Sequence, residues 1–259
     1  MEITGEQKRM FVIGGVGVIV IALLVLFSSQ GVINFRKKSE TELGGEATAT
    51  PRTDAWLTHE LSGRSYSSQG VPEQDVFILG GNASEVVRIR GDMTNAEMVY
   101  SAAAAVLHDP LQTGKSPLGP YPIGKPLGFT MGQWLSASGS GTYALRGEMA
   151  DVKLNFVKLV PGGVYTILCA RVTSSPNLVV TYRHCGASDG SQNFFKADAG
   201  GGASFALTMS PLEDSTDTAN SNLVLAYRSD GKDHDSNIGE LGVNTHLQMS
   251  FFIPPTFPF

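Results

Sequence analysis

The sequence predicts a mainly β protein: an antiparallel β-sandwich of Greek-key type with one or two short helices, preceded by a single N-terminal transmembrane helix. Three observations predict this class. Short segments of alternating apolar and polar residues recur through the second half of the chain, which is typical of strands that bury one face. Turn-forming residues separate these segments, and the 259 residues include 30 Gly and 13 Pro. An uncharged apolar segment lies near the start of the sequence.

This apolar segment covers residues 11–27 and reads FVIGGVGVIVIALLVLF. As a helix it would be about 26 Å long, close to the thickness of the hydrocarbon core of a bilayer. A cleaved signal peptide would have a shorter apolar core and would end in small residues, whereas Ser-Ser-Gln follows here. A helix buried in a globular domain would be amphipathic. We therefore predict a short tail over residues 1–10 and an uncleaved membrane anchor over residues 11–30.

The charges that flank this segment leave its orientation open. Lys8 and Arg9 precede it, and Arg36, Lys37 and Lys38 follow it, so the positive-inside rule favours a cytoplasmic C-terminal domain. Long domains, however, cross the membrane largely regardless of flanking charge. The choice of compartment therefore depends on the cysteines.

Cys169 and Cys185 are the two cysteines of the chain. They are either unrelated buried thiols or one disulfide, and we favour the disulfide because both lie at the ends of neighbouring predicted strands. It would close a loop of about 17 residues and contribute roughly 3 kcal/mol to stability. Disulfides persist in oxidising compartments, so we expect a single-pass protein of the cell membrane with its C-terminal domain outside the cytoplasm. No CxxC pair or Cys/His quartet predicts a structural zinc site.

A small, polar and flexible stalk is predicted over residues 31–54, followed by a mixed region over residues 55–140. In the mixed region, VFILGG (76–81) and EVVRIR (85–90) predict two strands around a turn.

Helix and loop signals follow in the mixed region. The segment 94–110 predicts a helix, because it combines a capping box, a run of alanines and a terminal proline. The proline-rich segment 115–128 predicts a loop or an extended strap. Thr130 and Gln133 form a second capping pattern, which predicts a single helical turn.

Residues 141–259 are predicted to form the sandwich. Helices do not alternate with its strands, which argues against a parallel α/β sheet, and turn clusters separate the strands, as in sandwiches and barrels. The predicted strands have the sequences DVKLNFVKL, VYTILCARV, NLVVTYRH, ASFALTMS, NLVLAYRS and HLQMSFFIP.

The distribution of charge excludes one class of partner. The chain has a net charge of −5, but residues 1–38 carry +3, so that the remainder carries −8. An acidic domain without a basic stripe does not suit the phosphate backbone of a nucleic acid. We therefore expect no nucleic-acid partner, contact with the membrane through residues 11–30, and a protein partner.

The stretch LAYRSDGKDHDSNIGELGVNTH, residues 225–246, gathers acids and two histidines between two predicted strands. Three interpretations remain open: a solvated hairpin loop, a metal site and a catalytic site. A copper or zinc site would need converging imidazoles, and its candidate ligands are His184, His234, His246 and Asp230. No nucleophile elbow, phosphate loop or dinucleotide fingerprint is found, so no catalytic residue and no cofactor is assigned.

Two stretches carry a family resemblance: DGSQNFFKADAGGGASFALTMSPL, residues 189–212, and LAYRSDGKDHDSNIGELGVNTHLQMSF, residues 225–251. They resemble secreted β-sandwich domains of the copper/zinc superoxide dismutase-like and CHRD-like kind, which share an F-x-A-D-x-x-G-x-A-x-F turn and a late loop with glycine and histidine. The resemblance covers residues 141–253 and implies the sandwich fold. Superoxide dismutases also carry an H-x-H pair, which none of the five histidines here forms, so dismutase activity is not implied.

These observations favour a membrane-anchored, extracytoplasmic β-sandwich that acts as a binding or structural module, such as an accessory subunit of a membrane or envelope complex, rather than an enzyme. A metal-binding, dismutase-like domain is the first alternative. A pilin-like filament subunit is the second, although the apolar segment lacks the early glutamate and the processing site of a pilin. The sequence Asn82-Ala83-Ser84 is an acceptor for N-linked glycosylation in a host that glycosylates secreted proteins.

Overall fold

The computed structural model describes residues 57–69, 73, 75–88, 95–106, 119–174 and 179–254. All of them belong to one compact unit that extends from Arg52 to Phe259. The predicted tail, anchor and stalk, residues 1–54, lie outside the described residues. Among the residues that are described, no helix has both the length and the apolar character needed to cross a membrane.

The first sheet of the sandwich follows from strict alternation along the sequence. In β8 (Met149–Val157), the side chains of Val152, Leu154 and Phe156 are buried and those between them face outward, as the two-residue period of a strand requires. The strand order is β1-β7-β8-β12, and all pairs are antiparallel. The other members are β1 (Leu57–Ser62), β7 (Ser138–Arg146) and β12 (Ala203–Met209).

Strand β7 begins with the sequence SGSG, and its two glycines lie where any side chain would clash with a neighbour. A Cβ atom at Gly139 would lie 2.8 Å from the ring of Phe251, which belongs to the opposite sheet. A Cβ atom at Gly141 would overlap the carbonyl oxygen of Lys153 on the neighbouring strand. Glycine therefore allows the backbone of β7 to approach the core and its partner strand closely.

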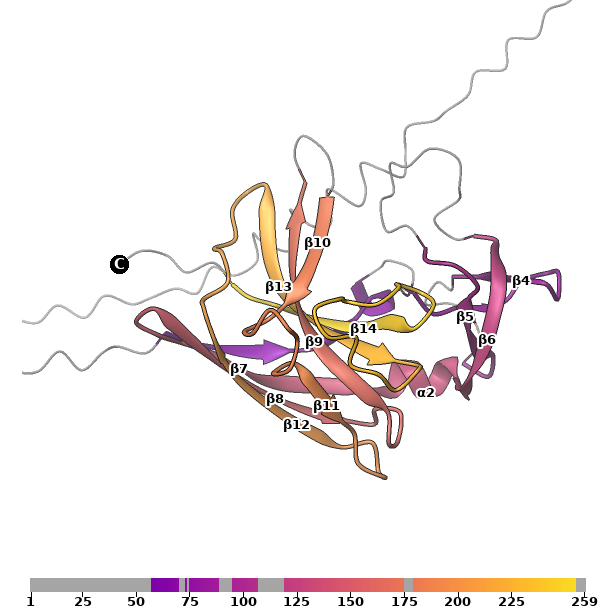
Figure 1. Cartoon of the computed structure of the whole chain (residues 1–259), viewed down its shortest axis with the longest axis horizontal. Helices are drawn as coiled ribbons and strands as arrows, with labels where there is room; N and C mark the ends of the chain where they lie inside the picture. Colours follow the sequence, from indigo (N-terminus) through magenta and orange to yellow (C-terminus); the bar gives the residue numbers. More distant parts are fainter. Residues whose placement is uncertain are drawn as a thin grey trace, which may run out of the picture. The chain divides into compact units, whose positions relative to one another are not determined.

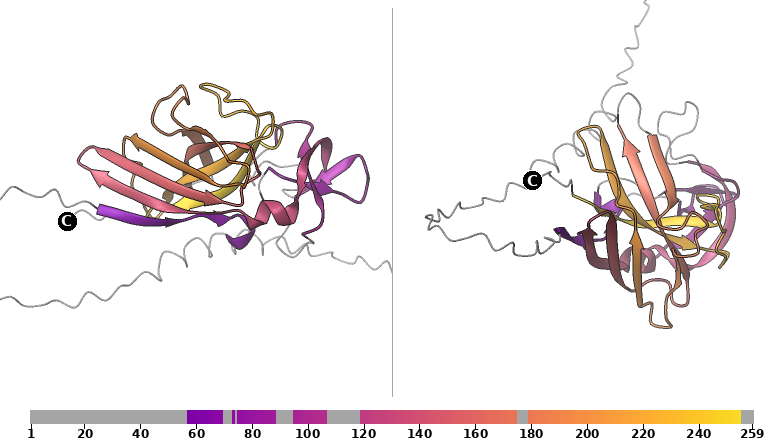
Figure 2. Two further views of the ribbon diagram at one scale, coloured as in Figure 1. Left: turned by 90° about the horizontal axis from the view of Figure 1, so that it is seen from below. Right: turned by 60° about the vertical axis from the view of Figure 1, so that its left-hand side comes forward.

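The second sheet has the strand order β10-β9-β13-β14-β2, with β11 paired to β9. It packs on the first sheet as a second layer, which Figure 2 shows from below, so the predicted antiparallel β-sandwich is confirmed. Its strands are β2 (Arg64–Ser65), β9 (Val164–Thr173), β10 (Val179–His184), β11 (Phe194–Lys196), β13 (Ala219–Arg228) and β14 (Thr245–Phe252). Aromatic rings fill the space between the layers, among them Phe156, Tyr165, Phe195 and Phe251.

The predicted disulfide is confirmed and lies in the core. Cys169 on β9 and Cys185, just after β10, are bonded, with 5.2 Å between their Cα atoms. Their exposed fractions are 2% and 0%, so the bond is covered by the packed interior, where it joins the middle of β9 to the residue that follows β10.

A smaller sheet lies beside the sandwich (Figure 1), with strand order β3-β4-β6-β5. Its own apolar cluster contains Phe77, Val86 and Tyr121. The hairpin predicted from the segments 76–81 and 85–90 is confirmed as far as residue 88, where the described residues end, since Ile78 pairs with Val87. The strands are β3 (Ile78–Leu79), β4 (Glu85–Val87), β5 (Met98–Ala102) and β6 (Tyr121–Thr130).

The helix predicted over residues 94–110 is wrong, because Met98–Ala102 forms β5 and pairs with β6. Val99 and Ser101 are buried in β5, and the pairing with β6 outweighs the helix propensity of the alanines that follow. The proline-rich segment 115–128 is extended from Tyr121 onward as part of β6.

The predicted single helical turn is confirmed as α2 (Met131–Ser136). Thr130 accepts a hydrogen bond from the backbone N–H of Gln133, and the Gln133 side chain accepts one from the backbone of Thr130, which is a complete capping box. The buried Trp134 stacks on Phe129, with ring centroids 5.6 Å apart. Trp134 Nε1 donates to the buried carboxylate of Glu73 at 3.2 Å. Gln248 Nε2 on β14 donates to the carbonyl oxygen of Trp134 at 3.0 Å, so α2 is fixed against the sandwich.

Candidate functional site

The acidic loop between β13 and β14 covers residues 229–244 and is organised by hydrogen bonds to its own backbone. Asp230 accepts from the N–H of Lys232 at 3.2 Å, and Asp233 accepts from the N–H of Asp235 at 3.2 Å. Asn237 accepts from the N–H of the residue two positions on in the same way. These are Asx turns. The acidic side chains thus serve the turns of the loop, which agrees with the solvated-hairpin interpretation.

The buried Arg228 holds this loop through two hydrogen bonds. The Arg228 guanidinium donates to the carbonyl oxygen of Ile238 and to the hydroxyl of Thr245. Burial lowers the pKa of Arg228 to about 10, against the opposing effect of Asp230 and Asp233. The side chain remains a cation at neutral pH and ties the middle of the loop to the end of the sheet.

Of the four candidate metal ligands, Asp230 and His234 contact each other. His234 Nε2 lies 3.0 Å from Asp230 Oδ2, and both side chains are largely covered. His234 and Asp235 have positive φ values of 27° and 48°, a backbone region that costs side-chain-bearing residues some energy. The pair closes the first turn of the loop.

His246 is engaged elsewhere. It is fully buried, its Nδ1 lies 2.6 Å from the carbonyl oxygen of Asp75, and its Nε2 lies 2.9 Å from Ser229 Oγ. Burial lowers the pKa of His246 to about 4, because the interior disfavours the imidazolium form. Both ring nitrogens are used in hydrogen bonds, so neither is available to a metal ion.

His184 ends β10 and is also buried. Its two ring nitrogens have no hydrogen-bond partner. The ring lies beside Gly190, where the loop after Cys185 meets the carbonyl oxygen of Asp235 in the acidic loop. In the part of the chain that the structure describes, no group of three or more His, Cys, Asp or Glu side chains is arranged to hold a metal ion.

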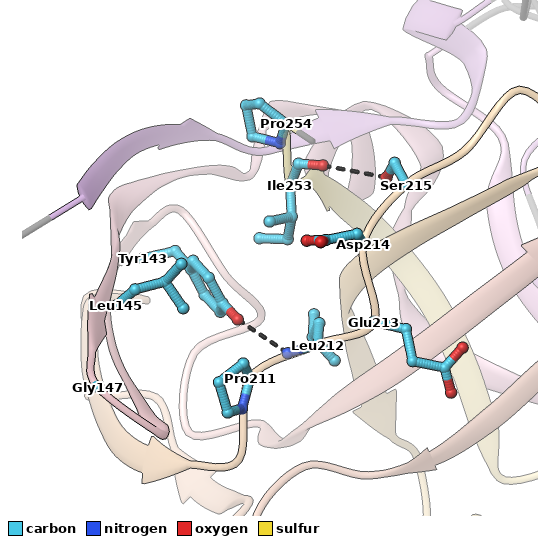
Figure 3. Close-up of a pocket in the computed structure, with 10 residues that line it drawn as sticks. All are labelled: Tyr143, Leu145, Gly147, Pro211, Leu212, Glu213, Asp214, Ser215, Ile253 and Pro254. Atoms are coloured by element: carbon cyan, nitrogen blue, oxygen red, sulfur yellow. Dashed lines mark hydrogen bonds between the residues drawn. The ribbon is translucent and has the colours of Figure 1, made fainter. Parts of the chain in front are cut away.

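A cavity of about 340 Å³ opens at the end of the sandwich, and Figure 3 shows its lining. We call it the end pocket. One wall is the end of the first sheet, the opposite wall is the end of β14, and a strap over residues 210–216, between β12 and β13, closes one side. Its lining residues are Tyr143, Leu145, Gly147, Pro211, Leu212, Glu213, Asp214, Ser215, Ile253 and Pro254.

Arg171 on β9 holds the strap in place. Its Nη1 donates to the carbonyl oxygens of Glu213 and Asp214 at 3.2 and 2.9 Å, and to Ser221 Oγ at 2.8 Å. Its Nε lies 3.4 Å from the exposed Glu213 carboxylate. One guanidinium thus contacts four oxygen atoms, three of them through Nη1 and one through Nε, and it always carries the charge that strengthens such contacts.

The strap is also tied to the two sheets. The N–H of Leu212 donates to the hydroxyl of Tyr143 at 2.8 Å, and Ser215 Oγ donates to the carbonyl of Ile253 at 3.4 Å (Figure 3). Burial raises the pKa of Tyr143, and Asp214 adds to this effect, so the phenol stays neutral and keeps its hydrogen bond. The end pocket is therefore preformed.

The chemistry of this lining suits binding. Aliphatic and prolyl side chains form its walls, whereas the hydroxyls of Tyr143 and Ser215 are engaged with backbone groups. The lining contains no histidine, cysteine or lysine, and its two acidic side chains, Glu213 and Asp214, are exposed.

Sequence reasoning missed the end pocket. Its lining comes from three segments that are far apart in the chain, namely β7, the strap and the end of β14, and their meeting depends on sheet topology. The one local signal is the strap sequence SPLEDST, in which proline and acids stand between two predicted strands.

No protein-family model, no curated protein and no solved structure matches this chain. The fold and the site define a disulfide-bridged β-sandwich with a preformed pocket at one end.

Proposed function

We propose that the chain is a membrane-anchored β-sandwich that lies outside the cytoplasm and acts as a binding or structural module, as an accessory subunit of a membrane or envelope complex. The observation that carries this proposal is the buried bond between Cys169 and Cys185. Disulfides form and persist in oxidising compartments. In this proposal, a helical anchor at residues 11–30 holds the domain at the membrane, and the stalk at residues 31–54 sets the distance between the membrane and the domain.

The end pocket supports binding as the activity of the module. It is concave, largely apolar and fixed before any partner arrives, which are the usual properties of a recognition site. A partner that inserts an apolar side chain would displace water without having to order the strap, because Arg171 and Tyr143 already hold it.

The metal-binding alternative has less support. His246 uses both of its ring nitrogens in hydrogen bonds, and His234 pairs with Asp230. The ring nitrogens of His184 have no hydrogen-bond partner, but among the described residues no group of three potential ligands gathers around this ring.

Site-specific photocrosslinking in native membranes tests the proposal. A photoreactive amino acid at the exposed Glu213 position should crosslink one partner protein. The matched control position is Lys153, which is exposed on the outer face of the first sheet, and it should not. Leu145→Trp, which fills the end pocket, should abolish the adduct. Adducts that are equal at both positions, or unchanged by Leu145→Trp, would contradict binding at the end pocket.

A further inference from the structure

The tip of the β3–β4 hairpin is an open, well-defined turn. The N–H of Gly80 donates to the carbonyl of Glu85 at 2.9 Å, and the N–H of Glu85 donates to the carbonyl of Asn82 at 3.0 Å. Residues 81–84 are all exposed, and a Cβ atom added at Gly81 would have no neighbour within 4 Å. The hairpin belongs to the smaller sheet beside the sandwich (Figure 1), so a large group could be attached at its tip without displacing protein.

Within this turn, Asn82 and Ser84 are held in one fixed arrangement. Asn82 Oδ1 accepts hydrogen bonds from the backbone N–H of Ser84 at 3.2 Å and from its hydroxyl at 3.0 Å. Hydrogen bonds to the amide oxygen draw electron density from the amide nitrogen and make its protons more acidic. The described residues offer no hydrogen-bond acceptor to Nδ2. The hydroxyl of the acceptor sequence therefore already contacts the side chain that would be modified.

We propose that Asn82 is an N-glycosylation site, an inference that rests on the proposed extracytoplasmic location. The donor is an oligosaccharide linked to a lipid diphosphate. Nδ2 of Asn82 forms a bond to C1 of the first sugar, the bond from C1 to the diphosphate oxygen breaks, and the lipid diphosphate leaves. The displaced amide proton passes to a base of the transferase, and no oxidant or reductant is needed.

A glycan at this position would also cover an exposed apolar side chain. Leu79 on β3 is 42% exposed. The chain just before β3 is paired on its other side, since Phe77 and Tyr100 of β5 exchange backbone hydrogen bonds, so the open part of this strand is its end at Leu79. A hydrated oligosaccharide three residues from Leu79 would shield this end from other chains.

The chain offers a matched control at a second turn. Asp189 Oδ1 accepts from the N–H of Ser191 at 3.0 Å and from its hydroxyl at 2.7 Å, which repeats the arrangement of Asn82 and Ser84. Asp189 is exposed. Asp189→Asn therefore creates an acceptor sequence, Asn-Gly-Ser, in the same local geometry on another part of the domain.

The experiment translates the full chain in the presence of endoplasmic-reticulum microsomes, which contain both the transferase and the lipid-linked donor. Modification is read as a gel shift that an endoglycosidase removes, and the site is assigned by peptide mass spectrometry. The wild-type chain should gain one glycan. Asn82→Gln and Ser84→Ala should lose it, Ser84→Thr should keep it, and Asp189→Asn should gain a second.

Two results would overturn the inference, and they have different consequences. If Asp189→Asn is modified at position 189 while Asn82 stays unmodified, the site at Asn82 is refuted and the extracytoplasmic location stands. If neither position is modified while a secreted control protein is, the domain has not been translocated, and both the inference and the proposed function fail.

Discussion

Removing the disulfide should lower the free energy of unfolding by about 3 kcal/mol, since the bond closes a loop of short, defined length. The two cysteines are separated by 16 positions, and the entropy of closing a loop of this length in the unfolded chain corresponds to about 3 kcal/mol at 25 °C. Cys169→Ala with Cys185→Ala also removes two buried sulfur atoms, and the resulting cavity adds on the order of 1 kcal/mol to the loss.

The assay is urea denaturation of the purified chain in mild detergent, followed by tryptophan fluorescence, which the buried Trp134 shares with Trp56. With a slope of about 2–3 kcal/mol per molar urea, the midpoint should fall by about 1–2 M. The wild-type chain in reductant is the matched control, because it loses the cross-link but keeps both sulfur atoms. If the midpoints of the reduced protein and the variant stay within about 0.3 M of the oxidised protein, corresponding to less than 1 kcal/mol, the reasoning is refuted.

Three further outcomes are expected. Arg171→Ala should destabilise the chain by about 1–3 kcal/mol because the strap acceptors lose their donor. Arg146 is exposed, so Arg146→Ala should cost less than about 1 kcal/mol in the same urea assay. Equal losses in the two variants would contradict the role of Arg171. Between pH 6.5 and about 4 the buried His246 binds fewer protons in the folded than in the unfolded chain. The free energy of unfolding should therefore decrease by up to about 3 kcal/mol as the pH is lowered through this range. His246→Gln should show a flatter dependence on pH, and an unchanged slope would refute this. Gly141→Ala should prevent folding or cost more than about 3 kcal/mol of stability. Gly147 has φ 56° and open space around it, so Gly147→Ala should cost only about 1 kcal/mol. Thermal unfolding compares the two variants, and similar losses would contradict the close approach of the β7 backbone to β8.

The sandwich could be predicted because its strands alternate locally. β8 shows the pattern without interruption, and turn residues mark the ends of most other strands. The disulfide followed from the positions of two cysteines on or next to neighbouring strands. The helix at α2 followed from a capping box of two residues, Thr130 and Gln133. In each case the interactions that determine the structure lie within a few residues or between adjacent strands.

β5 and the end pocket depend on contacts that no local pattern encodes. The alanine run after Met98 has high intrinsic helix propensity, but the chain gains more by pairing with β6, whose partners lie more than twenty positions away. The strap could not be placed without knowing that Arg171 on another strand would hold it. His246 is a candidate metal ligand by residue type. Its burial against Asp75 and Ser229 depends on the packing of distant segments, which the sequence does not reveal.

The most direct test of the proposed extracytoplasmic module is the redox state of Cys169 and Cys185 in native membranes. Because both cysteines are buried, free thiols are blocked while the cells are denatured, and after reduction the newly released thiols are labelled with a second reagent and quantified by mass spectrometry. The proposal predicts that both cysteines carry the second label, since they were joined in the cell. Both cysteines carrying the first label under denaturing trapping would show that the domain resides in a reducing compartment, and would contradict the proposed location.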